Sequence, residues 1–141
     1  MAKKLNILFL CTGNSCRSQM AEGWCRVLKG DTTLAFSAGI KKHGMNPLAL
    51  QVMKEVGVDL SQQSSKTTDE LPKIKFDFVF TVCGDAHENC PFFPGGKIIH
   101  VGFDDPPRLT QGMKDEAQIL GVYRRVRDEI KTFILQIEKY F

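Results

Sequence analysis

No apolar run in this sequence is long enough to span a membrane, and neither sign of charge dominates. Nineteen basic and sixteen acidic residues give a net charge of +3, which does not indicate a nucleic-acid-binding protein. No repeat, low-complexity tract or linker interrupts the 141 residues. We therefore expect one domain, 1–141, that is monomeric and cytoplasmic, is large enough to bury a core, and binds neither membranes nor nucleic acids.

The five cysteines do not favour a disulfide framework, because thiols stay reduced in the cytoplasm. They favour metal binding, redox chemistry or nucleophilic catalysis instead. Cys25 lies within a predicted helix, where we expect an ordinary packing residue. The functional argument depends on Cys11, Cys83 and Cys90.

Apolar segments alternate with helical patterns, which predicts a parallel sheet with helices on both faces. The predicted strands are Leu5–Leu10, Thr33–Ser37, Phe76–Val82 and Lys97–Val101, and the predicted helices are Ser18–Lys29, Pro47–Val56 and about Asp115–Lys139. Apolar spacing indicates buried helix faces, formed by Met20, Ala21, Trp24, Val27 and Leu28 in the first helix and by Ile119, Tyr123, Val126, Ile130, Phe133 and Ile137 in the last. We expect Arg124, Arg125 and Arg127 to form a solvated face.

The first predicted strand runs directly into a C-x5-R-S loop, which reads Cys11-Thr12-Gly13-Asn14-Ser15-Cys16-Arg17-Ser18. A strand, a loop and a helix in this order can bind a tetrahedral oxyanion, because successive backbone N–H groups and the helix N-terminus point at one spot. Arg17 can add a bidentate guanidinium. The same field favours the thiolate of Cys11 and presents it to the anion. The loop therefore predicts a cysteine nucleophile directed at phosphorus or arsenic.

The alternative for Cys11 is a purely structural residue at the end of a strand, since free cysteines are often buried. The preceding strand, the tight turn that Gly13 permits and the amphipathic helix that follows favour the oxyanion site. Asn14 and Ser18 can cap or brace the loop, and Ser18 can also hydrogen-bond the Cys11 sulfur. We expect Cys16 to contribute its backbone N–H more than its sulfur.

Cys83 and Cys90 follow the third predicted strand with C-x6-C spacing, which is not a zinc-site pattern. A redox pathway accounts for them better. Once the Cys11 thiolate has formed an adduct with arsenate, Cys83 can attack Cys11 and expel arsenic reduced by two electrons. Cys90 can then attack Cys83 and move the disulfide away from the pocket, where a thioredoxin-type dithiol would reduce it.

Asp105 follows the last predicted strand and directly precedes Pro106. The carboxyl ends of parallel strands meet at one edge of a sheet, so this carboxyl group can protonate an oxygen that leaves the bound anion. The other interpretation is that Asp105 caps a turn, because Asp-Pro pairs are frequent in turns. Its position after a strand favours the acid, and Asp104 is the weaker candidate.

Together these features resemble the thioredoxin-coupled arsenate reductases built on the low-molecular-weight protein tyrosine phosphatase fold. The matching stretches are 11–23, 37–40, 43–47, 83–91, 102–106 and 126–130. The resemblance implies an α/β three-layer sandwich with a four-stranded parallel sheet, and it assigns Cys11 as nucleophile, Cys83 and Cys90 as redox relay, Arg17 as anion clamp and Asp105 as general acid. It also implies arsenate as substrate, phosphate or sulfate as mimics, thioredoxin as reductant and no bound cofactor.

Two features depart from the family pattern. Some relatives hold a potassium ion near the loop through groups that match Asn14, Glu22 and Ser37, together with an acidic residue. The position aligned with that acid is Lys66, whose ammonium should repel potassium. We therefore expect no metal site, with Lys66 in place of the cation beside Glu22. Segment 107–121 is longer than its counterpart in relatives and could reshape either the mouth of the site or the thioredoxin contact.

Two other functions are compatible with parts of the sequence. A phosphatase acting on phosphotyrosine or small phosphate esters would use the same loop and Asp105. It would leave Cys83 and Cys90 idle, and Pro107 stands where the tyrosine phosphatases carry an aromatic wall. A non-enzymatic module that binds arsenite would leave Arg17 unexplained, because neutral arsenite needs no guanidinium. We expect arsenate reduction with weak phosphatase side activity.

Overall fold

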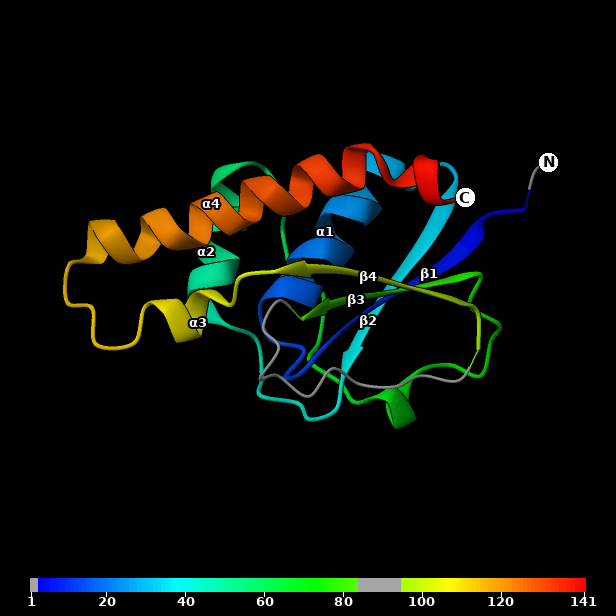
Figure 1. The fold of residues 1–141 in the computed structure, drawn as a ribbon, viewed down its shortest axis with the longest axis horizontal. Helices are drawn as coiled ribbons and strands as arrows, with labels where there is room; N and C mark the ends of the chain where they lie inside the picture. The colour runs from blue at the N-terminus through cyan, green and yellow to red at the C-terminus, as the bar shows by residue number, and fades with distance from the viewer. Residues whose placement is uncertain (1–2, 84–94) are drawn as a thin grey trace.

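The computed structural model describes residues 3–83 and 95–141. Its four strands are β1 (Leu5–Cys11), β2 (Thr33–Gly39), β3 (Phe78–Cys83) and β4 (Lys97–Phe103), and they form one parallel sheet in the order β2-β1-β3-β4. The long C-terminal helix runs along one side of this sheet (Figure 1). The predicted α/β class and four-stranded parallel sheet are confirmed.

The helices are α1 (Arg17–Lys29), α2 (Pro47–Glu55), α3 (Pro106–Leu109) and α4 (Glu116–Leu135), with short 3-10 helices η1 (Thr68–Glu70) and η2 (Ile137–Tyr140). The predicted end of the last helix near residue 139 is wrong, because α4 ends at Leu135. At Gln136 the backbone N–H bonds to the Phe133 carbonyl, which tightens the chain into η2. Ile137 still reaches the core from η2, so the apolar spacing continues past the end of α4.

Side chains at alternate positions of β1 enter two different apolar clusters. Ile7 and Phe9 belong to the larger cluster, which also contains residues of α1, α2 and α4. Leu8 belongs to the smaller cluster, which includes Phe76 and packs against Leu71 beside η1. The three helices thus cover one face of the sheet, and the chain around η1 covers the other. Although the sequence predicts helices on both faces, this short 3-10 helix is the only one of the described residues that lies on the second face.

The buried face of α1 differs at one position from the face predicted by apolar spacing. Met20, Ala21 and Trp24 are buried as expected, but Val27 is 50% exposed. Cys25 is fully buried in its place, as expected for a packing residue. The reason is that α1 packs against both the sheet and α4, so its buried stripe passes through residues 21, 24, 25 and 28.

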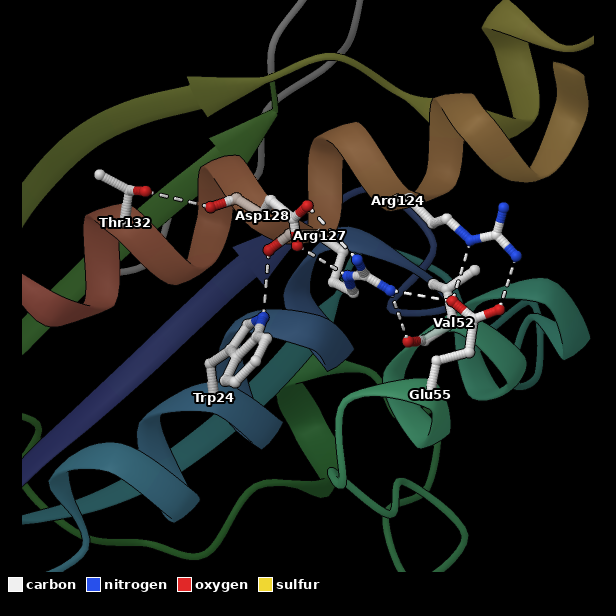
Figure 2. Close-up of polar contacts among 7 residues, drawn as sticks. All are labelled: Trp24, Val52, Glu55, Arg124, Arg127, Asp128 and Thr132. Carbon is white, nitrogen blue, oxygen red and sulfur yellow. Dashed lines mark hydrogen bonds and ion pairs between the residues drawn. The ribbon is translucent and has the colours of Figure 1, made fainter.

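Arg127 of α4 is buried, with 8% exposure, which contradicts its predicted place on a solvated face. Its guanidinium donates to the carbonyl of Val52 and to the carboxylate of Glu55, both at 3.0 Å, at the end of α2 (Figure 2). The indole N–H of Trp24 donates to the Arg127 carbonyl at 3.1 Å. Arg127 therefore joins α4 to α1 and α2, whereas Arg124 is half-exposed and binds the outer side of Glu55.

The carboxyl ends of β1, β3 and β4 carry Cys11, Cys83 and Phe103. Between β3 and β4 the register moves from Thr81 opposite His100 to Cys83 opposite Phe103, so β4 contains one extra residue. Gly102 lies in this bulge with a φ of 63°, and a Cβ atom there would come within 3.3 Å of the Cys83 carbonyl oxygen. The bulge sets the direction in which the chain leaves the sheet.

Candidate active site

Four consecutive carbonyl groups of the Cys11–Ser18 loop accept hydrogen bonds from the surrounding chain. The bonds run from Lys41 N–H to Thr12 O (3.1 Å), His43 N–H to Gly13 O (3.0 Å), the Gln19 amide to Asn14 O (3.1 Å) and Asn46 N–H to Ser15 O (3.0 Å). In a trans peptide the N–H of the next residue points opposite to the carbonyl, and no described peptide bond is cis. The N–H groups of residues 13–16 therefore face the other way.

On that side lies a cavity of about 430 Å³, which is lined by loop residues 11–13 and 15–17 and completed by Ile40, Lys41, His43, Asp105 and Pro107. Convergent backbone donors at the start of a helix, here α1, form a site for an anion. The cavity contains the segments that the sequence predicted for oxyanion binding, together with two basic side chains that it did not single out.

Asn14 holds the loop in place through hydrogen bonds of its buried side chain. It is fully buried and has a positive φ of 47°, a conformation that asparagine tolerates better than most residues. Its Oδ1 accepts from the Lys66 backbone N–H (2.8 Å) and from the Gln19 amide (2.9 Å), and its Nδ2 donates to Ser18 Oγ (2.8 Å). Asn14 braces the loop, which is one of the two roles that the sequence left open.

Ser18 continues this chain of hydrogen bonds to the Cys11 sulfur. Because Asn14 donates to Ser18 Oγ, the serine hydrogen is available for the sulfur, and the Ser18 Oγ to Cys11 Sγ distance is 3.4 Å. Cys11 is 3% exposed at the floor of the cavity. The Ser18 hydroxyl is therefore directed at the Cys11 sulfur, next to the start of α1.

Arg17 joins the loop to the chain that follows β4. Its Nη1 donates to the Phe103 carbonyl at 3.1 Å, and its Nη2 lies 3.7 Å from Asp105 Oδ2. Asp105 occupies the N-cap position of α3, but its side chain makes no capping hydrogen bond. Its carboxylate lines the cavity instead, whereas Asp104 binds Arg125 at 3.0 Å.

The four described cysteines are Cys11, Cys16, Cys25 and Cys83, and all are buried free thiols. Burial, followed by the charges of Cys11 and Asp105, raises the pKa of Cys16 far above the usual thiol range, so its sulfur stays protonated. Burial also raises the pKa of Cys25 to about 11. Cys83 ends β3, in the apolar cluster that includes Cys11. Cys90 lies outside the described residues.

Lys66, Glu22 and Ser37 lie beneath the loop. The ammonium of Lys66 donates to the carbonyls of Ser64 (2.8 Å) and Ser37 (3.4 Å), and Ser37 Oγ donates to the Glu22 carboxylate at 2.6 Å. Burial raises the pKa of Glu22, while the Ser37 hydrogen bond and the Lys66 charge oppose that rise. The Lys66 cation therefore acts electrostatically on Glu22.

Gln19 and Gln63 are two site residues that sequence reasoning did not identify. Gln63 donates to the Gln19 side chain at 2.8 Å, which fixes the amide that holds Asn14. Apolar periodicity carries no signal for such residues, because both are polar and Gln63 meets Gln19 across 44 positions of the sequence. In the two described stretches, 3–83 and 95–141, no group of three or more His, Cys, Asp or Glu could hold a metal ion. Among the same residues no helix is long and apolar enough to cross a membrane.

Residues 6–139 match the family described as low molecular weight phosphotyrosine protein phosphatase. An arsenate reductase of Halalkalibacterium halodurans is 51% identical over 138 residues, covering 94% of this chain and 96% of that protein. One from Bacillus subtilis is 52% identical over 125 residues, covering 88% of both. The structure of an arsenate reductase in a phosphate-binding state superimposes with a TM-score of 0.72 and 28% identity, covering 94% of this chain and 95% of that one. The chain therefore belongs to the low molecular weight phosphotyrosine protein phosphatase family, and within it resembles the arsenate reductases.

Proposed function

We propose that this protein reduces arsenate to arsenite, with Cys11 as nucleophile and Cys83 and Cys90 as a thiol relay. The observation that carries the proposal is the cavity in which the loop N–H groups and the Arg17 guanidinium surround Cys11. Arsenate is a tetrahedral oxyanion, so its charge and shape suit these donors. The arsenate reductases at about half identity to this chain support the choice of arsenic.

In the first step the Cys11 thiolate attacks the arsenic atom. A sulfur–arsenic bond forms and an arsenic–oxygen bond breaks, and the leaving hydroxyl group takes a proton from Asp105 and departs as water. The carboxyl group lies on the wall of the same cavity, 3.7 Å from the Arg17 guanidinium. The arsenic remains pentavalent in this adduct, and Arg17 and the loop N–H groups balance the charge on its oxygens.

The second step reduces the arsenic. The Cys83 thiolate attacks the Cys11 sulfur, so a disulfide forms, the sulfur–arsenic bond breaks, and its electron pair passes to arsenic, which leaves as arsenite. Cys90 then attacks Cys83, which regenerates the Cys11 thiol and leaves a Cys83–Cys90 disulfide. A thioredoxin dithiol reduces that disulfide and is itself oxidised, so the electrons balance. Such thiols need a reducing compartment, and we propose a cytoplasmic monomer.

Arsenate-dependent NADPH oxidation with thioredoxin and thioredoxin reductase tests the relay. The wild-type protein should turn over continuously, and Cys90→Ser should stop because the disulfide cannot leave Cys11. Cys25→Ser is the matched control, since Cys25 is buried against Thr33 and does not line the cavity. Equal turnover by wild type and Cys90→Ser would contradict the relay, and no turnover by wild type would contradict arsenate reduction.

A weak phosphatase activity is the second candidate, because the chain belongs to a phosphatase family and the cavity would accept a phosphate ester as well. Hydrolysis of p-nitrophenyl phosphate by wild type and Cys83→Ser separates the two functions. We expect slow hydrolysis that depends on Cys11 and is unchanged in Cys83→Ser. Fast hydrolysis in a protein that does not reduce arsenate would make the phosphatase the main function.

A further inference from the structure

Tyr123 of α4 carries a buried hydroxyl that the chemistry above does not use. Its side chain belongs to the larger apolar cluster and is 2% exposed. A buried hydroxyl needs a hydrogen-bond partner. The partner is Asn46, whose Nδ2 donates to the phenol oxygen at 3.1 Å.

Asn46 connects this hydroxyl to the oxyanion loop. Its Oδ1 accepts two backbone N–H groups at the start of α2, at 2.9 and 3.2 Å, and its own backbone N–H donates to the Ser15 carbonyl at 3.0 Å. Because the cap fixes Oδ1, it also fixes the direction of Nδ2, toward Tyr123. The hydroxyl thus steadies the residue that turns the Ser15 carbonyl outward and the Cys16 N–H inward.

The short helix α3, which follows Asp105, packs against α4, the helix that carries Tyr123. Thr110, the residue that ends α3, donates its hydroxyl to the Pro106 carbonyl at 2.8 Å. Burial raises the pKa of Tyr123, and the hydrogen bond that its oxygen accepts from Asn46 opposes the rise.

We propose that the Tyr123 hydroxyl is a positioning group that holds the oxyanion loop in its binding conformation through Asn46. This inference deepens the proposed function and rests on the oxyanion chemistry of the same site. Tyr123 acts through Asn46 and not by contact with the substrate. Removing the hydroxyl while keeping the ring should therefore weaken oxyanion binding with little loss of core packing.

Calorimetric titration with inorganic phosphate measures this effect without any redox step. Tyr123→Phe should bind phosphate roughly three- to tenfold more weakly, as expected for one lost hydrogen bond in the support of the loop. Tyr140→Phe is the matched control, because the other tyrosine of the chain lies on η2 and lines a different cavity. Its phosphate affinity should change by less than about twofold, because the substitution keeps the ring and removes a hydroxyl from a residue that does not line the oxyanion cavity.

Asn46→Ser provides a second route to the same contact. Serine retains an oxygen that caps α2 but lacks the amide donor to Tyr123, so this variant should weaken phosphate binding as Tyr123→Phe does. The double variant should be no weaker than either single one, because both remove one interaction. Wild-type affinity in Tyr123→Phe, or additive losses in the double variant, would overturn the proposal.

The phosphate titration also separates this inference from the proposed function. A wild-type protein that binds phosphate but does not reduce arsenate contradicts arsenate reduction and leaves the effect of Tyr123→Phe measurable. A wild-type protein that binds no phosphate contradicts both. Retained phosphate binding in Tyr123→Phe, together with a lowered melting temperature, would assign Tyr123 to core packing alone.

Discussion

At the scale of single residues, the site depends on buried polar side chains that hydrogen-bond to one another. Asn14 makes three side-chain hydrogen bonds at zero exposure, and Gln19 reaches Asn14 and the Ser64 carbonyl with one amide group. Buried polar groups of this kind are costly when a partner is removed, so they specify one conformation of the loop. The loop can therefore keep its N–H groups directed into the cavity before an anion arrives.

Glu22 gives a pH-dependent prediction at this scale. Burial raises the pKa of its carboxyl group in the folded protein above the ordinary value of 4.5. The folded state then holds this proton more tightly than the unfolded state, so the contribution to stability is present below pH 4.5 and is lost as pH rises through the raised pKa. Glu22→Gln should lack this loss.

Urea denaturation of both proteins between pH 4 and pH 8 measures the difference. The free energy of unfolding of wild type, relative to Glu22→Gln, should fall as pH rises through this window. A difference that does not change with pH would show that Glu22 titrates alike in the folded and unfolded states.

Lys66 gives a prediction about ions. Its ammonium donates hydrogen bonds to the Ser37 and Ser64 carbonyl oxygens, which places a fixed positive charge beside Glu22. Lys66→Asp should lose arsenate reduction in sodium buffer and regain it when potassium is added, whereas wild type should be indifferent to potassium. Lys42→Asp is a control, because Lys42 binds Glu70 at the surface. If added potassium does not change arsenate reduction by Lys66→Asp, Lys66 does not take the place of a potassium ion.

At the scale of elements, Arg127 joins three helices around one buried guanidinium. It bonds to Val52 and Glu55 at the end of α2, and its carbonyl accepts the indole N–H of Trp24 from α1 (Figure 2). Arg127→Met keeps the long apolar stem but leaves the Val52 carbonyl without this donor. We expect a loss of about 1–3 kcal/mol in the free energy of unfolding.

Arg124→Met is the matched control for Arg127→Met. Arg124 binds the same Glu55 from a half-exposed position, where solvent screens the ion pair and its contribution to stability is small. Urea denaturation monitored by the fluorescence of Trp24, the single tryptophan, compares the two variants directly. Equal losses in both would indicate that burial of Arg127 adds nothing beyond a surface ion pair.

Much of the fold could be predicted because its signals are local. Alternating apolar segments located all four strands, and the C-x5-R-S loop located the cavity. The buried role of Arg127 and the hydroxyl contact of Tyr123 could not be predicted, because helical spacing separates faces but does not reveal which polar groups meet across elements. Likewise the β4 bulge at Gly102 depends on pairing with β3, which a single segment does not encode.

At the scale of the whole molecule, two apolar clusters lie on opposite faces of one sheet and share the strands β1 and β3. Because both clusters pack on the same strands, disruption of one also destabilises the other. We therefore expect residues 1–141 to unfold as one unit. Trp24 fluorescence reports the larger cluster, and far-UV circular dichroism reports all elements. The two urea transitions should coincide. Separate midpoints would show that the chain around η1 unfolds independently.

The outward-facing carbonyl groups of the oxyanion loop have a consequence for selectivity in the cell. A binding site made largely of main-chain amides offers few side chains whose substitution could change its anion selectivity. Phosphate also matches arsenate in shape and charge. Where phosphate is abundant, it should therefore bind in the cavity repeatedly without reacting. Discrimination then falls to the chemistry after binding, because thiols reduce pentavalent arsenic and leave pentavalent phosphorus unchanged. Such an enzyme would select arsenate by the ease with which thiols reduce it and not by its shape or charge.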